Sequence, residues 1–161
     1  MITVDLVSCV VDDSLCAVGR SLGYSSLTSS LPFIVGMDSR VVRETVEKKR
    51  NCVLLDPHRS ASRYLLHQRD SGLNQVLCRF AARHGIIIAF SLPYLRTAYD
   101  IGAVMQNISL CRKYHVPVAL VSCADSALGL RSVRDMQAFG RVLGMSSQEA
   151  VLCVSVLAPF V

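Results

Sequence analysis

A continuous run of apolar residues at positions 86–90 constrains the fold of this chain more than any other stretch. The run does not alternate between polar and apolar residues, which is typical of a strand buried on both faces in a parallel sheet. Before it, apolar residues recur at the spacing of one helix face: Leu73, Val76, Leu77, Phe80 and Ala81. Gly85 lies between the two segments and suits the left-handed end of a helix. The stretch therefore predicts a helix that leads directly into a buried strand.

The same alternation of helices and strands is expected along the rest of the chain. Asp70 or Ser71 is expected to cap the helix described above, since a short side-chain oxygen accepts from free amide groups. We expect strands at 2–11, 30–36, 52–56 and 117–123, and helices at 15–22, 39–50, 100–114, 132–143 and 146–157. This order predicts an α/β protein with a parallel sheet, in one domain over residues 1–161. A closed barrel of eight units normally needs about 200 residues or more.

The composition excludes several classes of protein. No apolar run approaches the roughly 18–20 residues of a membrane span. The first residues also lack the basic flank of a signal peptide, so we expect a soluble, cytoplasmic chain without a membrane partner. The seven cysteines form no C-x-x-C pair and lie in or beside apolar stretches. We therefore expect free thiols rather than disulfide bonds or a zinc site.

Basic residues are concentrated in the middle of the chain. The formal charge is +5, from 17 basic and 12 acidic residues, and arginine outnumbers lysine by 14 to 3. The basic residues of this middle segment are Arg40, Arg43, Lys48, Lys49, Arg50, Arg59, Arg63 and Arg69. A guanidinium group suits phosphate pairing and base stacking, so the segment predicts a polyanionic partner such as nucleic acid. The alternative is a charged face that contacts only solvent.

Acidic residues at the ends of two expected strands are candidate metal ligands. Asp56 and Asp125 each follow such a strand, at the edge where α/β proteins place their sites. With His58, His67 or His84 they could bind a metal ion. The histidines share no metal-binding motif, however, so the sequence does not select a ligand set.

Two further groups of residues could carry chemistry. Ser122 and Cys123 could supply a nucleophile at a strand end, but the sequence places no base beside them, and small residues there also serve packing. Arg131 and Arg134 lie three residues apart at an expected helix start, where both could grip a phosphate. Alternatively, Arg131 could pair with Asp135 as a structural clamp.

Four segments, in one order, resemble the archaeal ribonuclease P protein component 3 family. They are RDSGLNQVLCRFAARHGIIIAFSL (69–92), YHVPVALVSCADS (114–126), LRSVRDM (130–136) and LGMSSQEA (143–150). The resemblance extends over residues 50–157, while residues 1–49 match only loosely. Four linked motifs in one order are far more specific than any one of them.

The resemblance implies a barrel-like (β/α) fold related to the polymerase and histidinol phosphatase metal hydrolases. It also implies a subunit of ribonuclease P, the ribonucleoprotein that cuts the 5′ leader from precursor tRNA. In that complex the RNA carries out the hydrolysis with magnesium, and this subunit binds and stabilises the RNA without a cofactor of its own. The implied partners are the ribonuclease P RNA, protein component 2, the other ribonuclease P proteins, and precursor tRNA as the substrate.

Residue roles follow from the resemblance together with the basic middle segment. The family motifs mark Arg69 and Arg131 as RNA contacts, and Asp135 as the residue that holds Arg131. The full set of expected RNA-binding residues is Arg69, Arg131, Arg134, Arg59, Arg63, Lys48, Lys49 and Arg50. No residue of this subunit is expected to be catalytic or to bind a metal.

The chain also departs from the family pattern. Gln75 replaces a histidine, Val133 a proline, Ala89 and Phe90 a Glu-Ile pair, and Asp5-Leu6-Val7 a His-x-His motif. These losses weaken the case for a metal centre. The chain is also shorter than the family norm between residues 24 and 50, which predicts a shortened and incompletely closed barrel. A metal-dependent phosphoesterase on the same fold and an interaction protein without an RNA role are the alternative functions.

Overall fold

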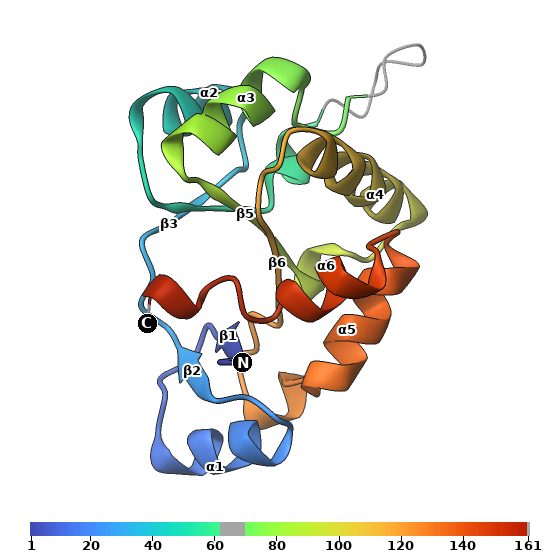
Figure 1. The fold of residues 1–161 in the computed structure, drawn as a ribbon. Helices are drawn as coiled ribbons and strands as arrows, with labels where there is room; N and C mark the ends of the chain where they lie inside the picture. The colour runs from blue at the N-terminus through green and yellow to red at the C-terminus, as the bar shows by residue number, and fades with distance from the viewer. Residues whose placement is uncertain (62–69, 161) are drawn as a thin grey trace.

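The computed structural model describes residues 1–61 and 70–160 (Figure 1). Its strands are β1 (Val4–Leu6), β2 (Ser26–Thr28), β3 (Phe33–Val35), β4 (Val53–Leu55), β5 (Ile87–Ser91) and β6 (Val118–Val121). Its α-helices are α1 (Asp13–Ser21), α2 (Ser39–Lys48), α3 (Gln75–His84), α4 (Ala98–Lys113), α5 (Val133–Val142) and α6 (Ser147–Leu152). The 3₁₀ helices are η1 (Pro57–Ser60), η2 (Leu92–Tyr94), η3 (Ala127–Gly129) and η4 (Ala158–Phe160). The predicted α/β class is confirmed, while a single domain over residues 1–161 stays a prediction.

All pairs of described strands are parallel, as the apolar runs predicted. β1 pairs with β2, and β3, β4, β5 and β6 form a four-stranded sheet in that order. A parallel bridge between Val7 and Ala124 joins the two groups, so the strands follow one another as β2-β1-β6-β5-β4-β3. Within the described residues β2 and β3, at the two ends of this series, do not pair. The expected incompletely closed barrel is therefore confirmed.

The join between β1 and β6 is completed by the segment after α6. Towards the carboxyl ends of the strands, the Cys123 amide donates to the Leu6 carbonyl at 2.9 Å. Towards the amino ends, the Val4 amide donates instead to the Val154 carbonyl at 2.9 Å. The prediction that the last helix extends to residue 157 is wrong, because α6 ends at Leu152 and the backbone that follows pairs with a strand.

The strands lie between two hydrophobic clusters, which explains the continuous apolar run in the sequence. All five residues of β5 are buried. Ile88 and Phe90 belong to a cluster with side chains of the helices, including Val104 and Met136. Ile87 and Ala89 belong to a second cluster with side chains of β1, β4 and β6. Since both faces of β5 are covered by apolar groups, no position in the run can be polar.

The helix α3 begins later than predicted, and neither Asp70 nor Ser71 caps it. The Asn74 side chain accepts two amide N–H groups of the first turn, each at 3.0 Å. Asp70 instead accepts the Gly72 amide at 2.9 Å, in a turn where Gly72 has φ +84°. A Cβ atom at Gly72 would lie 2.0 Å from the Pro57 carbonyl oxygen, so this close approach requires glycine. A tertiary contact with η1 therefore shifts the start of the helix.

One position of the predicted apolar helix face lies in solvent instead of the core. Val76 is 52% exposed, while Cys78 is buried on the same helix. β1 is also shorter than the expected strand at 2–11, and β2 lies in a serine-rich segment without a predicted strand. Gly85 has the predicted left-handed conformation, with φ +65°. None of the described helices combines the length and the apolarity that a membrane span needs.

Replacing Phe90 with alanine should lower the free energy of unfolding by about 3–5 kcal/mol, because the fully buried ring leaves a cavity. Chemical denaturation followed by circular dichroism measures this change. The matched control is Phe33→Ala in β3, whose side chain is 39% exposed and should cost about 1 kcal/mol or less. Equal losses in the two variants would contradict the two-sided burial of β5.

Candidate functional site

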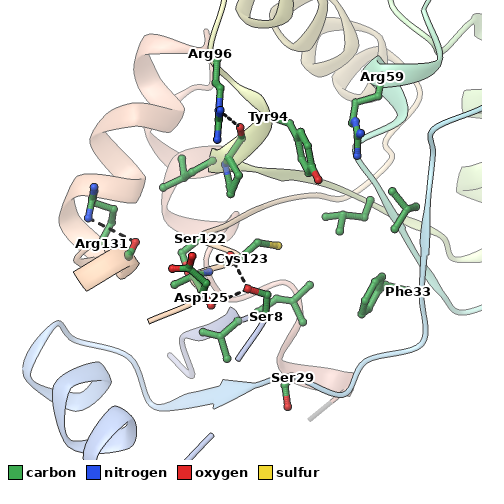
Figure 2. A pocket seen from close by; sticks show the side chains of 18 of the residues that line it. Ser8, Ser29, Phe33, Arg59, Tyr94, Arg96, Ser122, Cys123, Asp125 and Arg131 are labelled. Carbon is green, nitrogen blue, oxygen red and sulfur yellow. Dashed lines mark hydrogen bonds between the residues drawn. The ribbon is translucent and has the colours of Figure 1, made fainter. Parts of the chain in front are cut away.

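A cavity of about 800 Å³ lies at the carboxyl edge of the strands (Figure 2). Segments that follow β1, β4, β5 and β6 contribute to its lining, because parallel strands bring their carboxyl ends to one edge. We call it the edge cavity. Its lining includes buried apolar groups such as Leu6 and Leu55. Phe33 and Tyr94, which are partly exposed, lie at its rim (Figure 2). A second cavity, of about 650 Å³, is lined by residues of α2 and of the segment that begins α3.

Three arginine side chains line the edge cavity. Arg59 comes from η1, Arg96 follows η2, and Arg131 precedes α5. Arg96 and Arg131 are exposed, and Arg59 is half-buried. Among the described residues of the lining, Asp125 is the one acidic residue, so three positive charges face one negative charge there. The fold thus collects positive charge from three distant parts of the sequence at one edge of the barrel.

Two of these arginines are held by contacts within the lining itself. The Arg59 guanidinium carbon lies 3.7 Å from the centroid of the Tyr94 ring, a cation–π contact. Nε2 of the buried His58 lies 3.2 Å from the Tyr94 carbonyl oxygen and anchors this segment. Arg96 Nε donates to the Pro93 carbonyl at 2.7 Å. The Tyr94 ring, which follows β5, and the Arg59 guanidinium, which comes from η1, therefore lie side by side in the lining.

Arg131 is held by backbone carbonyl groups and not by Asp135. Its Nη1 donates to the Leu130 carbonyl at 2.9 Å and to the Leu128 carbonyl at 3.1 Å. The Asp135 amide donates to Ser132 Oγ at 3.1 Å, and Ser132 is the N-cap of α5. No ion pair joins these two described residues, Arg131 and Asp135. The turn before α5 therefore supplies the acceptors of Arg131 in this structure, and a supporting role of Asp135 at an RNA site stays a prediction.

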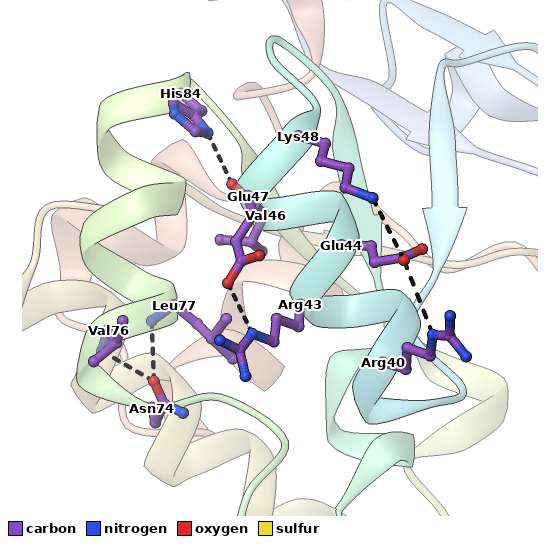
Figure 3. Close-up of polar contacts among 10 residues, drawn as sticks. All are labelled: Arg40, Arg43, Glu44, Val46, Glu47, Lys48, Asn74, Val76, Leu77 and His84. Carbon is purple, nitrogen blue, oxygen red and sulfur yellow. Dashed lines mark hydrogen bonds and ion pairs between the residues drawn. The ribbon is translucent and has the colours of Figure 1, made fainter.

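The basic residues of α2 lie away from the edge cavity, and several are paired within the helix (Figure 3). Lys48 Nζ lies 3.5 Å from a Glu44 carboxylate oxygen. Arg43 Nε lies 2.8 Å from Glu47. The end of α2 leads into the amino end of β4, whereas the edge cavity lies at the carboxyl ends. This arrangement favours a solvated charged face for α2.

The structure therefore divides the predicted RNA-binding residues into separate groups. Arg59 and Arg131 line the edge cavity, and Arg134 is exposed on α5 outside the lining. Lys48, Lys49 and Arg50 lie at the opposite edge of the sheet. Arg63 and Arg69, together with His67, lie outside the described residues. The sequence prediction missed Arg96 and Tyr94, although they follow the most strongly predicted strand, where α/β proteins place functional side chains.

Two buried carboxylates lie next to the lining of the edge cavity. Asp5 accepts the Ser122 amide at 2.7 Å. Asp56 accepts the Ser91 amide at 2.8 Å and the Ser91 hydroxyl at 2.5 Å. Burial raises the pKa of Asp5 from 3.8 to about 6 and also raises the pKa of Asp56, and the hydrogen bonds oppose both shifts. These carboxylates serve as acceptors for the backbone after β5 and β6.

The candidate metal ligands do not come together. His84 Nδ1 lies 2.8 Å from the Val46 carbonyl oxygen, near the opposite edge of the sheet. His58 Nδ1 lies 3.9 Å from an Asp56 carboxylate oxygen, but Asp56 already accepts hydrogen bonds from Ser91. Asp125 is exposed on the rim of the edge cavity. Over residues 1–61 and 70–160, no three His, Cys, Asp or Glu side chains gather in a way that could hold a metal ion.

The candidate nucleophiles are also not activated. Burial, together with the neighbouring Asp56 and Asp5, raises the pKa of Cys123 to about 12, so the thiol is protonated at neutral pH. Ser122 is buried, and its hydroxyl accepts the Ala124 amide at 3.1 Å. The arrangement is suited to binding an anion and has no activated nucleophile at this strand end.

Comparison with known proteins finds relatives of one kind. Ribonuclease P protein component 3 of Methanosarcina mazei is 33% identical over 129 residues, which cover 76% of this chain and 54% of the relative. The proteins of the same name from Methanococcoides burtonii and Thermococcus gammatolerans are 31% and 33% identical, covering 74% and 75% of this chain. The match covers 49% of the Methanococcoides burtonii protein and 56% of the Thermococcus gammatolerans protein, so the chain spans about half the length of these curated relatives. No family model matches the chain.

A solved structure shows the same fold. It is a chain from a cryo-EM structure of archaeal ribonuclease P with mature tRNA, with a TM-score of 0.63 and 19% sequence identity. The match covers 98% of this chain and 78% of the other. The resemblance drawn from the four sequence motifs is thus confirmed, and the similarity in three dimensions includes the N-terminal segment that the motifs did not reach.

In the original chain, the titration of Asp5 should lower the free energy of unfolding as the pH rises from about 4 to 6. Replacing Asp5 with asparagine should remove that decrease. Because the pKa of Asp5 in the folded protein is about 6, above the ordinary 3.8, the folded state binds its proton more tightly. The protonated Asp5 carboxyl group therefore contributes its full stabilisation below about pH 4, and this stabilisation is lost as the pH rises through 6. One pKa unit corresponds to about 1.4 kcal/mol, so the change should be on the order of 2–3 kcal/mol. Urea unfolding from pH 4 to 7 measures it.

The control is Asp12→Asn at the start of α1. The Leu15 amide donates to this exposed carboxylate and lowers its pKa, so its contribution has the opposite pH dependence. An unchanged pH profile in Asp5→Asn would contradict the assignment of a raised pKa to Asp5.

Proposed function

Because this chain belongs to the ribonuclease P protein component 3 family, we propose that it is a protein subunit of ribonuclease P. That ribonucleoprotein removes the 5′ leader from precursor tRNA. In the proposal the RNA of the complex carries out the hydrolysis with magnesium, and this chain binds and stabilises that RNA. The family relation carries the proposal, since about three quarters of the chain aligns with relatives of this name.

The edge cavity supports the proposed RNA-binding role. Arg59, Arg96 and Arg131 offer guanidinium groups to phosphate, and one aromatic ring lies against a guanidinium. The protonated Cys123 thiol and the scattered metal-ligating residues do not favour a catalytic centre of its own. This geometry supports the proposal of a binding subunit, and the phosphoesterase remains the alternative function.

The proposed partners follow from the same relation. They are the ribonuclease P RNA, protein component 2 and the other ribonuclease P proteins, with precursor tRNA as the substrate of the whole complex. We expect this subunit to bind no cofactor and to act in the cytoplasm. A solved structure of archaeal ribonuclease P that contains a similarly folded chain supports the assignment to this kind of assembly.

Reconstitution tests the proposal. The full chain alone should not cut precursor tRNA, but together with ribonuclease P RNA and component 2 it should raise the cleavage rate severalfold at limiting magnesium. Cleavage is followed by gel electrophoresis of end-labelled precursor tRNA. Cutting by the isolated chain, abolished by a chelator and by Asp56→Ala, would instead establish the phosphoesterase. No gain on reconstitution would favour an interaction protein without an RNA role.

Salt dependence tests the charge of the edge cavity in the same RNA complex. Each phosphate neutralised by the protein releases a counterion, so log affinity falls linearly with log salt concentration. Replacing Arg131 with glutamine should reduce that slope by about 1. The matched control is Arg83→Gln, which removes the same charge from exposed α3 at the opposite edge of the sheet. Equal slopes in the two variants would contradict a phosphate contact at Arg131.

A further inference from the structure

We propose that the edge cavity binds one unpaired nucleotide of RNA, with its base stacked on the Arg59–Tyr94 pair and its phosphate on Arg96. The inference deepens the proposed function and rests on it, since it names the kind of RNA segment that this site would take. It also assigns roles to Tyr94 and Arg96, which neither the sequence motifs nor the basic middle segment marked.

The dimensions of the edge cavity suit a single nucleotide. Its volume of about 800 Å³ lies within the range of sites for small molecules and is far too small for a double helix. Bases in an RNA duplex are stacked on one another, and side chains cannot read the deep, narrow major groove. An unpaired nucleotide can turn its base out of the strand and into the cavity. The shape therefore selects single-stranded segments.

The base position is defined by stacked side chains. Tyr94 and Arg59 both line the cavity, and the guanidinium carbon lies 3.7 Å from the ring centroid. Tyr94 is 43% exposed, and on the rim of the same cavity Phe33 is 39% exposed (Figure 2). Flat guanidinium and aromatic groups are the surfaces on which unpaired bases stack. The hydrogen bond of His58 to the Tyr94 backbone orders this platform before a ligand arrives.

The phosphate position is defined by Arg96. Its Nε donates to the Pro93 carbonyl at 2.7 Å, which directs the side chain along the rim. In the described part of the chain, its two terminal nitrogens donate to no protein acceptor, and both remain available to a phosphate. Tyr94 and Arg96 are two residues apart in the chain, and both line the edge cavity. Arg131 on the far side of the cavity adds positive charge for an adjacent phosphate.

An acidic peptide is the other polyanion that three arginines could recognise. Carboxylates need only the charge, and a stacked ring contributes nothing to holding them. The pairing of an exposed aromatic ring with a guanidinium inside the cavity therefore favours a ligand that carries both a flat ring and a phosphate. RNA has this combination in every residue.

Fluorescence anisotropy with the full chain tests the proposal, using labelled hexauridylate and a labelled RNA duplex of the same length. Tyr94→Ala and Arg96→Gln should each weaken hexauridylate binding about tenfold, while Tyr94→Phe, which keeps the ring, should stay within twofold of the original chain. Duplex binding should be weaker and unaffected by Tyr94→Ala. Circular dichroism melting verifies that each variant is folded.

Arg83→Gln is the matched control, since it removes the same charge as Arg96→Gln at the opposite edge of the sheet and should change binding less than twofold. Equal loss in Arg83→Gln and Arg96→Gln, or no loss in Tyr94→Ala, would overturn the proposal. Competition by hexaglutamate together with an unaffected Tyr94→Ala would identify an acidic-peptide site and would also overturn it.

Failure of this inference is distinguishable from failure of the proposed function. If reconstituted cleavage rises with the chain but Tyr94→Ala leaves hexauridylate binding unchanged, the nucleotide site is wrong and the subunit role stands. If hexauridylate binds and depends on Tyr94 and Arg96 but reconstitution shows no gain, the nucleotide site stands and the ribonuclease P role is wrong.

Discussion

The hydrogen bond from the Ser122 amide to the buried Asp5 carboxylate connects the two groups of strands on which the rest of the structure depends. β1 and β6 diverge here to admit the segment after α6, so this amide needs an acceptor other than the neighbouring strand. Burying a carboxylate costs free energy, and the raised pKa of Asp5 reflects that cost. Asp56 likewise accepts the backbone amide of Ser91, the last residue of β5. Both carboxylates are therefore committed to the backbone of the barrel.

The edge cavity exists because these joins bring the carboxyl ends of parallel strands together. Arg59, Arg96 and Arg131 are distant in the sequence and meet only at this edge. The same two carboxylates that hold the edge together leave no acidic cluster for a metal ion among the described residues. The site thus combines a positive, partly aromatic rim with a floor that lacks an activated nucleophile. This arrangement supports the binding of an anionic ligand.

Charge alone was a poor guide to the site. The basic middle segment contains the highest density of positive charge, yet Arg43 and Lys48 pair with glutamates on their own helix. Exposed pairs of this kind contribute little to stability but reduce the field that α2 presents. Arg96, isolated in the sequence, lies in the cavity because it follows a buried strand. Position relative to the sheet therefore matters more than local charge density.

The sequence by itself determined the α/β class, the parallel strands, the buried run of β5 and the left-handed Gly85, because each depends on local periodicity or on the conformation of one residue. It also determined the family, through four motifs in one order. Only the tertiary structure decided that Asn74 caps α3, that β2 forms, and that carbonyl groups hold Arg131 instead of Asp135. It also decided that Tyr94 and Arg96 share a cavity with Arg131. The pairing of β2 and the lining of the edge cavity depend on contacts between residues far apart in the chain, which no local pattern encodes. The Asn74 cap and the Arg131 contacts are local, but the sequence offered neighbouring alternatives between which only the folded structure chose.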